Sequence, residues 1–230
     1  MQPVQCDISS CFLCQHCLAE WKPVIAAHKT TYAFKKGEAL FVEGDAVKGI
    51  FFLRAGAVKV HRKWGGQKEL IIRFAGAGDI VGHRGLGAGA AYPVSATALE
   101  AGSACFVPAE FLEASLKVNQ SLAEQLIRFY AAELQRAEQR MSELARMDVK
   151  SRIARALFAL DESFGKDAKG YIGIPISRQD IAAYAGTIYE TVFKVFSEWI
   201  AAGLIVTEGK HVRIKSMSKL MARVAGGKPR

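Results

Sequence analysis

The segment that decides the fold is RQDIAAYAGTIYETVFKVF, residues 178–196. Ala182 is small at the place where two helices must approach each other closely, and Gly186 stands where the turn between them needs a positive φ. Val192 and Val195 are apolar at the positions that pack a second helix against the first. This combination predicts a helix-turn-helix, a motif that places its second helix in the major groove of DNA.

The flanking residues support this interpretation. Ser177 is the expected N-cap of the first helix, and Asp180 three residues later gives an approximate capping box. The second helix is expected to begin near Tyr189, and a short hairpin, IVTEGKHVRI at 205–214, follows as a wing. Residues 148–230 carry 14 basic and 8 acidic side chains, most of the chain's net charge of +9. We therefore interpret them as a winged DNA-binding domain, in preference to two ordinary core helices.

The second helix of this motif carries the expected base contacts. Glu190 and Lys194 stand four residues apart and share a face. Glutamate can accept from cytosine N4 and lysine can donate to guanine O6 and N7, although Lys194 could instead neutralise only a phosphate. Phe193 could contact a thymine methyl, whereas the wing residues are expected to hold the DNA backbone. The predicted DNA-contacting residues are Ser177, Arg178, Tyr189, Glu190, Phe193, Lys194, Lys210, His211 and Arg213.

Length, composition and charge narrow the class of protein. The chain has 230 residues, of which 50% are hydrophobic and 23% charged, so wholesale disorder is excluded. Its positive charge suits nucleic acid first and an anionic membrane second. No run approaches the about 18 apolar residues of a membrane span, and the start lacks the features of a secretory signal, which predicts a cytoplasmic protein without membrane association. Because no catalytic constellation, P-loop or dinucleotide fingerprint is present, we predict no enzymatic activity.

Two regions precede the DNA-binding domain. Residues 21–108 show short alternating runs separated by glycine turns, which indicate a β-sandwich, jelly roll or barrel. Residues 109–147 are helical in composition, and their apolar positions recur at gaps of four and three. Such a seam forms either a contact with the helix's own domain or, as we predict for this length, a homodimer interface. The seam consists of Ala123, Ile127, Tyr130, Leu134, Ala137, Met141 and Leu144.

The cysteines form the second unusual feature. Four of the five lie within twelve residues, at Cys6, Cys11, Cys14 and Cys17, and Cys105 lies far downstream. Such short gaps disfavour disulfides and indicate a metal or redox site in residues 1–20. The run from Cys11 to Cys17 has the ferredoxin spacing C-x2-C-x2-C, so an iron–sulfur cluster is one interpretation. The alternatives are a zinc site, a Cys11–Cys14 dithiol switch, a structural role for Cys105, and no cofactor at all.

The order of these parts resembles the CRP/FNR family of bacterial transcription regulators. The resemblance rests on KKGEALFVEGD (35–45), GIFFLRAGAVKV (49–60), GAGDIVGHRGLG (76–87) and the segment 177–196. It implies a cyclic-nucleotide-binding-type jelly roll, a dimerisation helix, RNA polymerase as a partner and a palindromic double-stranded DNA target. It also implies that Glu190 and Lys194 take the places of the family's base-reading Glu and Arg.

Two branches of the family differ in what they sense. The catabolite-activator branch holds a cyclic nucleotide with Gly-Glu and Arg-Ser pairs, whereas this chain has Gly82-His83 and, near the second place, Ser95. Since no arginine lies between Arg84 and Arg128, a cyclic phosphate would lack its partner, and cyclic AMP is not expected. The candidate effector pocket is Gly82, His83, Arg84 and Ser95.

The FNR branch holds a [4Fe–4S] cluster with three N-terminal cysteines and one strand cysteine, and the sequences around VGHRGLGAG and Cys105 resemble it. The N-terminal spacing, C-x4-C-x2-C-x2-C, departs from that branch. The candidate metal ligands are therefore Cys6, Cys11, Cys14, Cys17 and Cys105.

Together these observations predict an α+β protein with four parts. They are a cysteine-rich arm (1–20), a β jelly roll (21–108), a dimerisation helix (109–147) and a winged helix-turn-helix (148–230). The predicted function is a homodimeric, sequence-specific transcription regulator that senses redox state, oxygen or a small effector. The alternatives are an iron–sulfur or zinc redox protein, and a cyclic-nucleotide-binding module that does not bind DNA.

Overall fold

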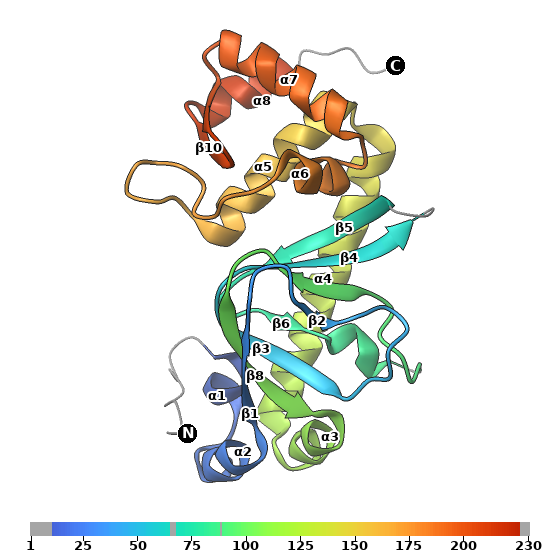
Figure 1. The fold of residues 1–230 in the computed structure, drawn as a ribbon. Coiled ribbons are helices and arrows are strands. Elements are labelled where there is room, and N and C mark those ends of the chain that lie inside the picture. The colour runs from blue at the N-terminus through green and yellow to red at the C-terminus, as the bar shows by residue number, and fades with distance from the viewer. Residues whose placement is uncertain (1–10, 65–67, 88, 226–230) are drawn as a thin grey trace. The chain divides into compact units, whose positions relative to one another are not determined.

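The fold is described from a computed structural model that covers residues 11–64, 68–87 and 89–225 (Figure 1). Cys6 lies outside these residues. The chain divides into two compact units, Met1–Arg62 with Ala75–Arg136 and Lys63–Phe74 with Ala137–Arg230. No helix of the described residues is both long enough and apolar enough to span a membrane.

Two four-stranded sheets form the β part of the chain. Their orders are β1-β8-β3-β6 and β2-β7-β4-β5. The strands are β1 (Thr30–Phe34), β2 (Ala39–Phe41), β3 (Gly49–Ala55), β4 (Val58–Trp64), β5 (Lys68–Ala75), β6 (Ile80–Val81), β7 (Ser95–Ala98) and β8 (Gly102–Pro108). Neighbours far apart in sequence, such as β1 and β8, pair antiparallel, as the jelly-roll interpretation requires.

Strand β3 is one of the two interior strands of its sheet. Ile50, Phe51, Phe52 and Leu53 are all buried, and each contributes about 1.5–3 kcal/mol by leaving water. Close pairing with β8 explains Gly49, where a Cβ would lie 2.1 Å from the carbonyl oxygen of Val107. The same register sets Phe52 opposite Cys105, and thus places that cysteine on the interior strand β8.

Helices flank these sheets. They are α1 (Phe12–His16), η1 (Ala19–Trp21), α2 (Lys22–His28), η2 (His83–Leu86), α3 (Ala109–Val118) and α4 (Gln120–Arg146). The helical region predicted from composition consists of two helices, because Asn119 between them has φ −117° and ψ 83° and leaves the helical conformation. Figure 1 shows α1 and α2 beside β1 and β8.

The second unit contains the helix-turn-helix and its wing. Besides most of β5 and the C-terminal part of α4, its elements are α5 (Val149–Phe164), α6 (Arg178–Ala185), α7 (Tyr189–Ala201), β9 (Ile205–Glu208), β10 (His211–Ile214) and α8 (Met217–Ala225). Asp148 caps α5 by accepting from the Ser151 amide, and the core includes Leu157, Leu160 and Phe196. Helix α8 was not expected from the sequence.

Candidate nucleic-acid interface and cysteine site

The residues that cap α6 and start α7 determine the turn between these two helices. The Ser177 hydroxyl oxygen accepts a hydrogen bond from the Asp180 amide at 3.0 Å, which confirms the predicted N-cap. Gly186 ends α6 with φ 60° and ψ 48°, which confirms the positive φ expected there. Helix α7 begins at Tyr189, as predicted.

Helix α7 has one buried and one exposed face. Val192 and Val195 are buried, whereas Glu190 and Lys194 are exposed. Tyr189 and Phe193 are 43% and 52% exposed, and their rings stack with centroids 6.4 Å apart. Ile188, just before the helix, is also exposed, and the sequence reasoning did not identify it. The outer face therefore offers an acceptor, a donor and an apolar aromatic surface, the groups that read base edges.

The other predicted DNA contacts separate into two kinds. Lys210 and His211 are exposed at the turn of the wing and its second strand. Arg178 donates to the Gly209 carbonyl at 3.4 Å and lies over the Phe196 ring, 5.4 Å from its centroid. Arg213 donates to the Lys169 carbonyl at 3.3 Å and lies 5.3 Å from the centroid of Tyr171. These two arginines hold the wing and a neighbouring loop in place.

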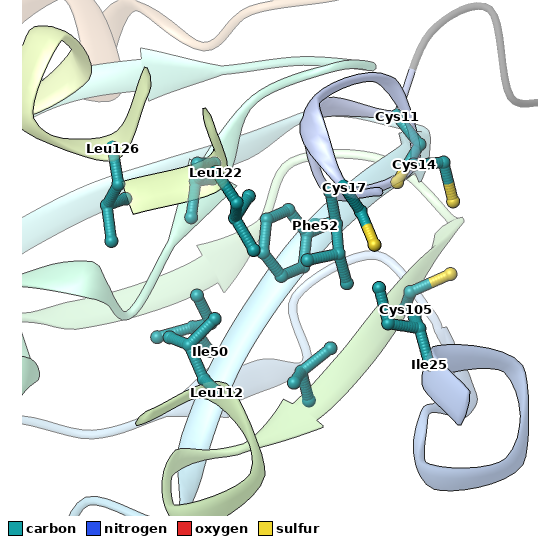
Figure 2. Packing of buried hydrophobic residues seen from close by; sticks show 13 residues of the cluster. Cys11, Cys14, Cys17, Ile25, Ile50, Phe52, Cys105, Leu112, Leu122 and Leu126 are labelled. Carbon is teal, nitrogen blue, oxygen red and sulfur yellow. The ribbon is translucent and has the colours of Figure 1, made fainter. Parts of the chain in front are cut away.

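Four of the five cysteines lie in one buried cluster. Cys11, Cys14 and Cys17 come from α1 and its two ends, and Cys105 comes from β8. Figure 2 shows the four cysteine side chains in the same part of this buried cluster, near Phe52 and Ile25. Burial raises the pKa of the Cys17 thiol, an effect that the nearby Lys22 partly opposes.

These cysteines have the donor chemistry of a metal site without its arrangement. Within residues 11–64, 68–87 and 89–225, no three His, Cys, Asp or Glu side chains form a group that could hold a metal ion. Thiolates are nevertheless the ligands that iron–sulfur clusters and structural zinc prefer. The four buried cysteines therefore offer the type of ligand that such a site needs. The fifth cysteine, Cys6, lies outside the part of the chain that the structure describes.

Asn119 anchors the cysteine-bearing arm. Its side-chain oxygen accepts from the Leu18 amide at 2.9 Å and from the Cys17 thiol at 3.5 Å. Its side-chain nitrogen donates to the Ser115 carbonyl at 2.9 Å, and the Trp21 indole donates to the Ser115 hydroxyl at 3.1 Å. The arm is thus attached at the junction between α3 and α4, a contact that sequence patterns did not indicate.

The predicted effector residues lie in different surroundings. Gly82 (φ 86°) precedes η2, and the buried His83 accepts from the Tyr130 hydroxyl through its carbonyl at 2.6 Å. A buried carboxylate, Glu133 of α4, lies 3.4 Å from His83 Nε2 and 3.4 Å from Arg84 Nη2. The Ser95 hydroxyl, by contrast, accepts from a backbone amide, that of residue 43, at 2.9 Å.

The seam residues of α4 differ in exposure. Ile127, Leu134 and Met141, spaced by seven, are 69%, 61% and 69% exposed. Ala137 is also exposed, whereas Tyr130 and Leu144 are partly buried. The exposed members form an apolar row on one face of the helix.

A β-sheet domain, a long helix and a winged helix-turn-helix together define a class, the transcription regulators that join a sensor domain to a DNA-binding domain. Residues 32–119 match the family model of the cyclic nucleotide-binding domain, and residues 151–223 match that of the Crp-like helix-turn-helix domain. The chain belongs to the CRP/FNR family of DNA-binding transcription regulators, and the predicted fold class is confirmed.

Two curated relatives and one solved structure illustrate the similarity. The transcriptional activator FnrA of Stutzerimonas stutzeri is 36% identical over 197 residues, covering 84% of this chain and 79% of the relative. The transcriptional activator Anr of Pseudomonas aeruginosa gives the same identity and coverage. The structure of FixK2 from Bradyrhizobium japonicum has a TM-score of 0.76 and 25% identity, and covers 87% of this chain and 99% of that one.

Proposed function

We propose that two copies of this chain form a homodimer that binds a palindromic DNA site and reads bases with Glu190 and Lys194. The main support for this proposal is the outer face of α7, where these two side chains and Phe193 are exposed while Val192 is buried. Lys210 and His211 on the wing then contact phosphates, which position the protein without specifying sequence.

The exposed row on α4 supports the homodimer. Ile127, Leu134 and Met141 recur every seven residues, the spacing of a two-helix seam. Two copies joined along this row would present two α7 helices to half-sites about one helical turn apart. Because the named relatives are transcriptional activators, we also propose RNA polymerase as a partner, and we place the protein in the cytoplasm with its DNA target.

The signal proposed for this regulator is redox state or oxygen. Cys11, Cys14, Cys17 and Cys105 are buried together, and these or a set including Cys6 would hold a [4Fe–4S] cluster, with zinc as the alternative. A bound cluster would supply a centre that changes with oxidation. The donor chemistry and the relatives support this proposal.

The DNA-binding proposal is tested by selecting a site from genomic fragments and measuring affinity for it. Binding of the intact protein should weaken steeply with salt. We expect Lys194→Ala to cost about 1–3 kcal/mol on the selected site and to relax preference at one base pair. Lys117→Ala, at an exposed lysine of α3, is the control. If Lys194→Ala lost the same affinity on every DNA sequence, Lys194 would be a phosphate contact only. If Glu190→Ala kept the base preference of the intact protein, Glu190 would not read bases.

The cofactor proposal is tested by anaerobic purification with iron, sulfide and zinc analysis of one sample. We expect broad visible absorption and about four irons per chain, as for a thiolate-bound cluster. Loss of this signal in Cys105→Ser, with retention in Ser103→Ala on the same strand, would assign Cys105 as the fourth ligand. Zinc alone would assign the arm a structural role, and a metal-free colourless protein would refute the cluster.

A further inference from the structure

The C-terminal end of α6 is held by two arginines from other helices. Arg140 of α4 donates to the Tyr184 carbonyl, and Arg152 of α5 donates to the Ala185 carbonyl at 2.8 Å and to the Gly186 carbonyl at 3.5 Å. The last carbonyls of a helix lack partners within it and carry the negative end of its dipole. Guanidinium groups therefore fix both the position and the direction of this helix end.

Arg152 also joins this end to the long helix. Its Nη1 donates to the Met147 carbonyl at 2.8 Å, one residue beyond the end of α4. One planar guanidinium thus contacts the end of α4 and the end of α6. Its fixed geometry allows little change in the angle between those two ends.

Arg140 forms the second connection between the same elements. Its guanidinium carbon lies 4.0 Å from the centroid of the Tyr184 ring, and its Nη1 lies 3.6 Å from Glu143. Glu143 is buried and also pairs with Arg155 at 3.1 Å. A pair with a buried carboxylate keeps its geometry because breaking it leaves the buried charge without compensation.

We propose that Arg140 and Arg152 are positioning residues for DNA binding, which set the direction of α7 relative to the C-terminal part of α4. Helix α7 follows α6 through the Gly186 turn, where a Cβ would lie 3.3 Å from Leu144 of α4. Fixing the end of α6 therefore fixes the start of the recognition helix. This inference rests on the proposed homodimer, in which the angle between α4 and α7 determines the separation of the two half-sites.

A role in spacing differs measurably from a role in folding alone. The test uses palindromes with identical half-sites and spacers that differ by single base pairs, together with one isolated half-site. The intact protein should prefer one spacer. Arg140→Met should reduce that preference by about threefold to thirtyfold, the range of measured couplings, while half-site affinity stays within about twofold. Arg140→Lys, which keeps the charge without the planar fork, should give a smaller loss.

The control is Arg146→Met, an exposed arginine at the end of the same helix, which should keep the spacer preference. If Arg140→Met lost the same DNA affinity for the half-site and for palindromes of every spacer, Arg140 would have a purely structural role, and the inference would be wrong. An intact protein that binds palindromes no better than one half-site would overturn the homodimer first, before any variant is compared. Circular dichroism of each variant establishes that the helices are retained.

Discussion

The side-chain oxygen of Asn119 accepts a hydrogen bond from the backbone amide of Leu18 at 2.9 Å, across 101 residues of sequence. Asn119 is fully buried and stands between α3 and α4. Leu18 follows directly after Cys17, so the cysteine-bearing arm and the start of the long helix share one polar side chain. A change in the position of the arm would therefore act directly on the residue that precedes α4.

Removal of this contact should loosen the arm. Asn119→Ala removes the acceptor of the Leu18 amide in a partly buried hydrogen bond, which costs about 1 kcal/mol. We expect faster hydrogen exchange at Leu18 and faster alkylation of Cys17. Gln120→Ala, at an exposed position, is the control, and equal alkylation rates in all proteins would contradict this role.

The turn of the helix-turn-helix should be intolerant of a side chain. Gly186→Ala places a Cβ at φ 60°, which costs about 1–2 kcal/mol, and adds a 3.3 Å contact with Leu144. Gly203→Ala is a matched control, because Gly203 has φ 67° and no atom within 4 Å of its Cβ position. Urea unfolding should show a larger loss in free energy for Gly186→Ala. A smaller loss than in the control would mean that Leu144 does not restrict the turn.

The proposed dimer should depend on the exposed row of α4. Leu134→Glu puts a charge at the middle of the row and, in a two-helix seam, places two like charges together. Sedimentation should show a shift from dimer to monomer for Leu134→Glu. Gln135→Glu adds the same charge at the neighbouring exposed position and should remain dimeric. Dissociation in both variants would point to net charge as the cause.

The sequence predicted best what depends on near neighbours. Ser177 and Gly186 are end signals read within a few residues, and both have the predicted conformation. The face of α7 followed from helical spacing, which places Glu190 and Lys194 together. Alternating runs indicated strands, whereas the order in which the strands pair was seen only in the structure.

Contacts between distant segments could not be predicted in this way. Asn119 is a polar residue between two helical stretches, and its partners lie on an arm about one hundred residues earlier. Arg140 and Glu133 look like ordinary charged positions on a helix surface, yet Glu133 is buried, Arg140 is largely covered, and they contact partners 49 and 44 residues away. Each also has an opposite charge three residues away on the same helix, but only the fold adds the Tyr184 carbonyl and the Arg84 guanidinium as distant partners.

The buried carboxylate of Glu133 lies beside His83 and Arg84 of the candidate effector pocket. A cyclic phosphate needs an available cation. In this protein Arg84 pairs with the Glu133 carboxylate at 3.4 Å, and Arg136 pairs with the same group at 2.8 Å. The Ser95 hydroxyl is engaged with a backbone amide. The cation of the candidate effector pocket is thus paired with an internal carboxylate.

We therefore expect cyclic AMP to leave the thermal midpoint unchanged. A ligand at one hundred times its Kd would add about 2.7 kcal/mol, enough to raise the midpoint of a chain this size by several degrees. Glu133→Gln, which removes the carboxylate charge, should lower the midpoint by about 2–6 °C, since Arg84 and Arg136 lose their partner but remain partly exposed. Glu138→Gln, on the exposed side of the helix, should have little effect. A saturable rise with cyclic AMP in the intact protein would show that the pocket accepts the nucleotide despite Glu133.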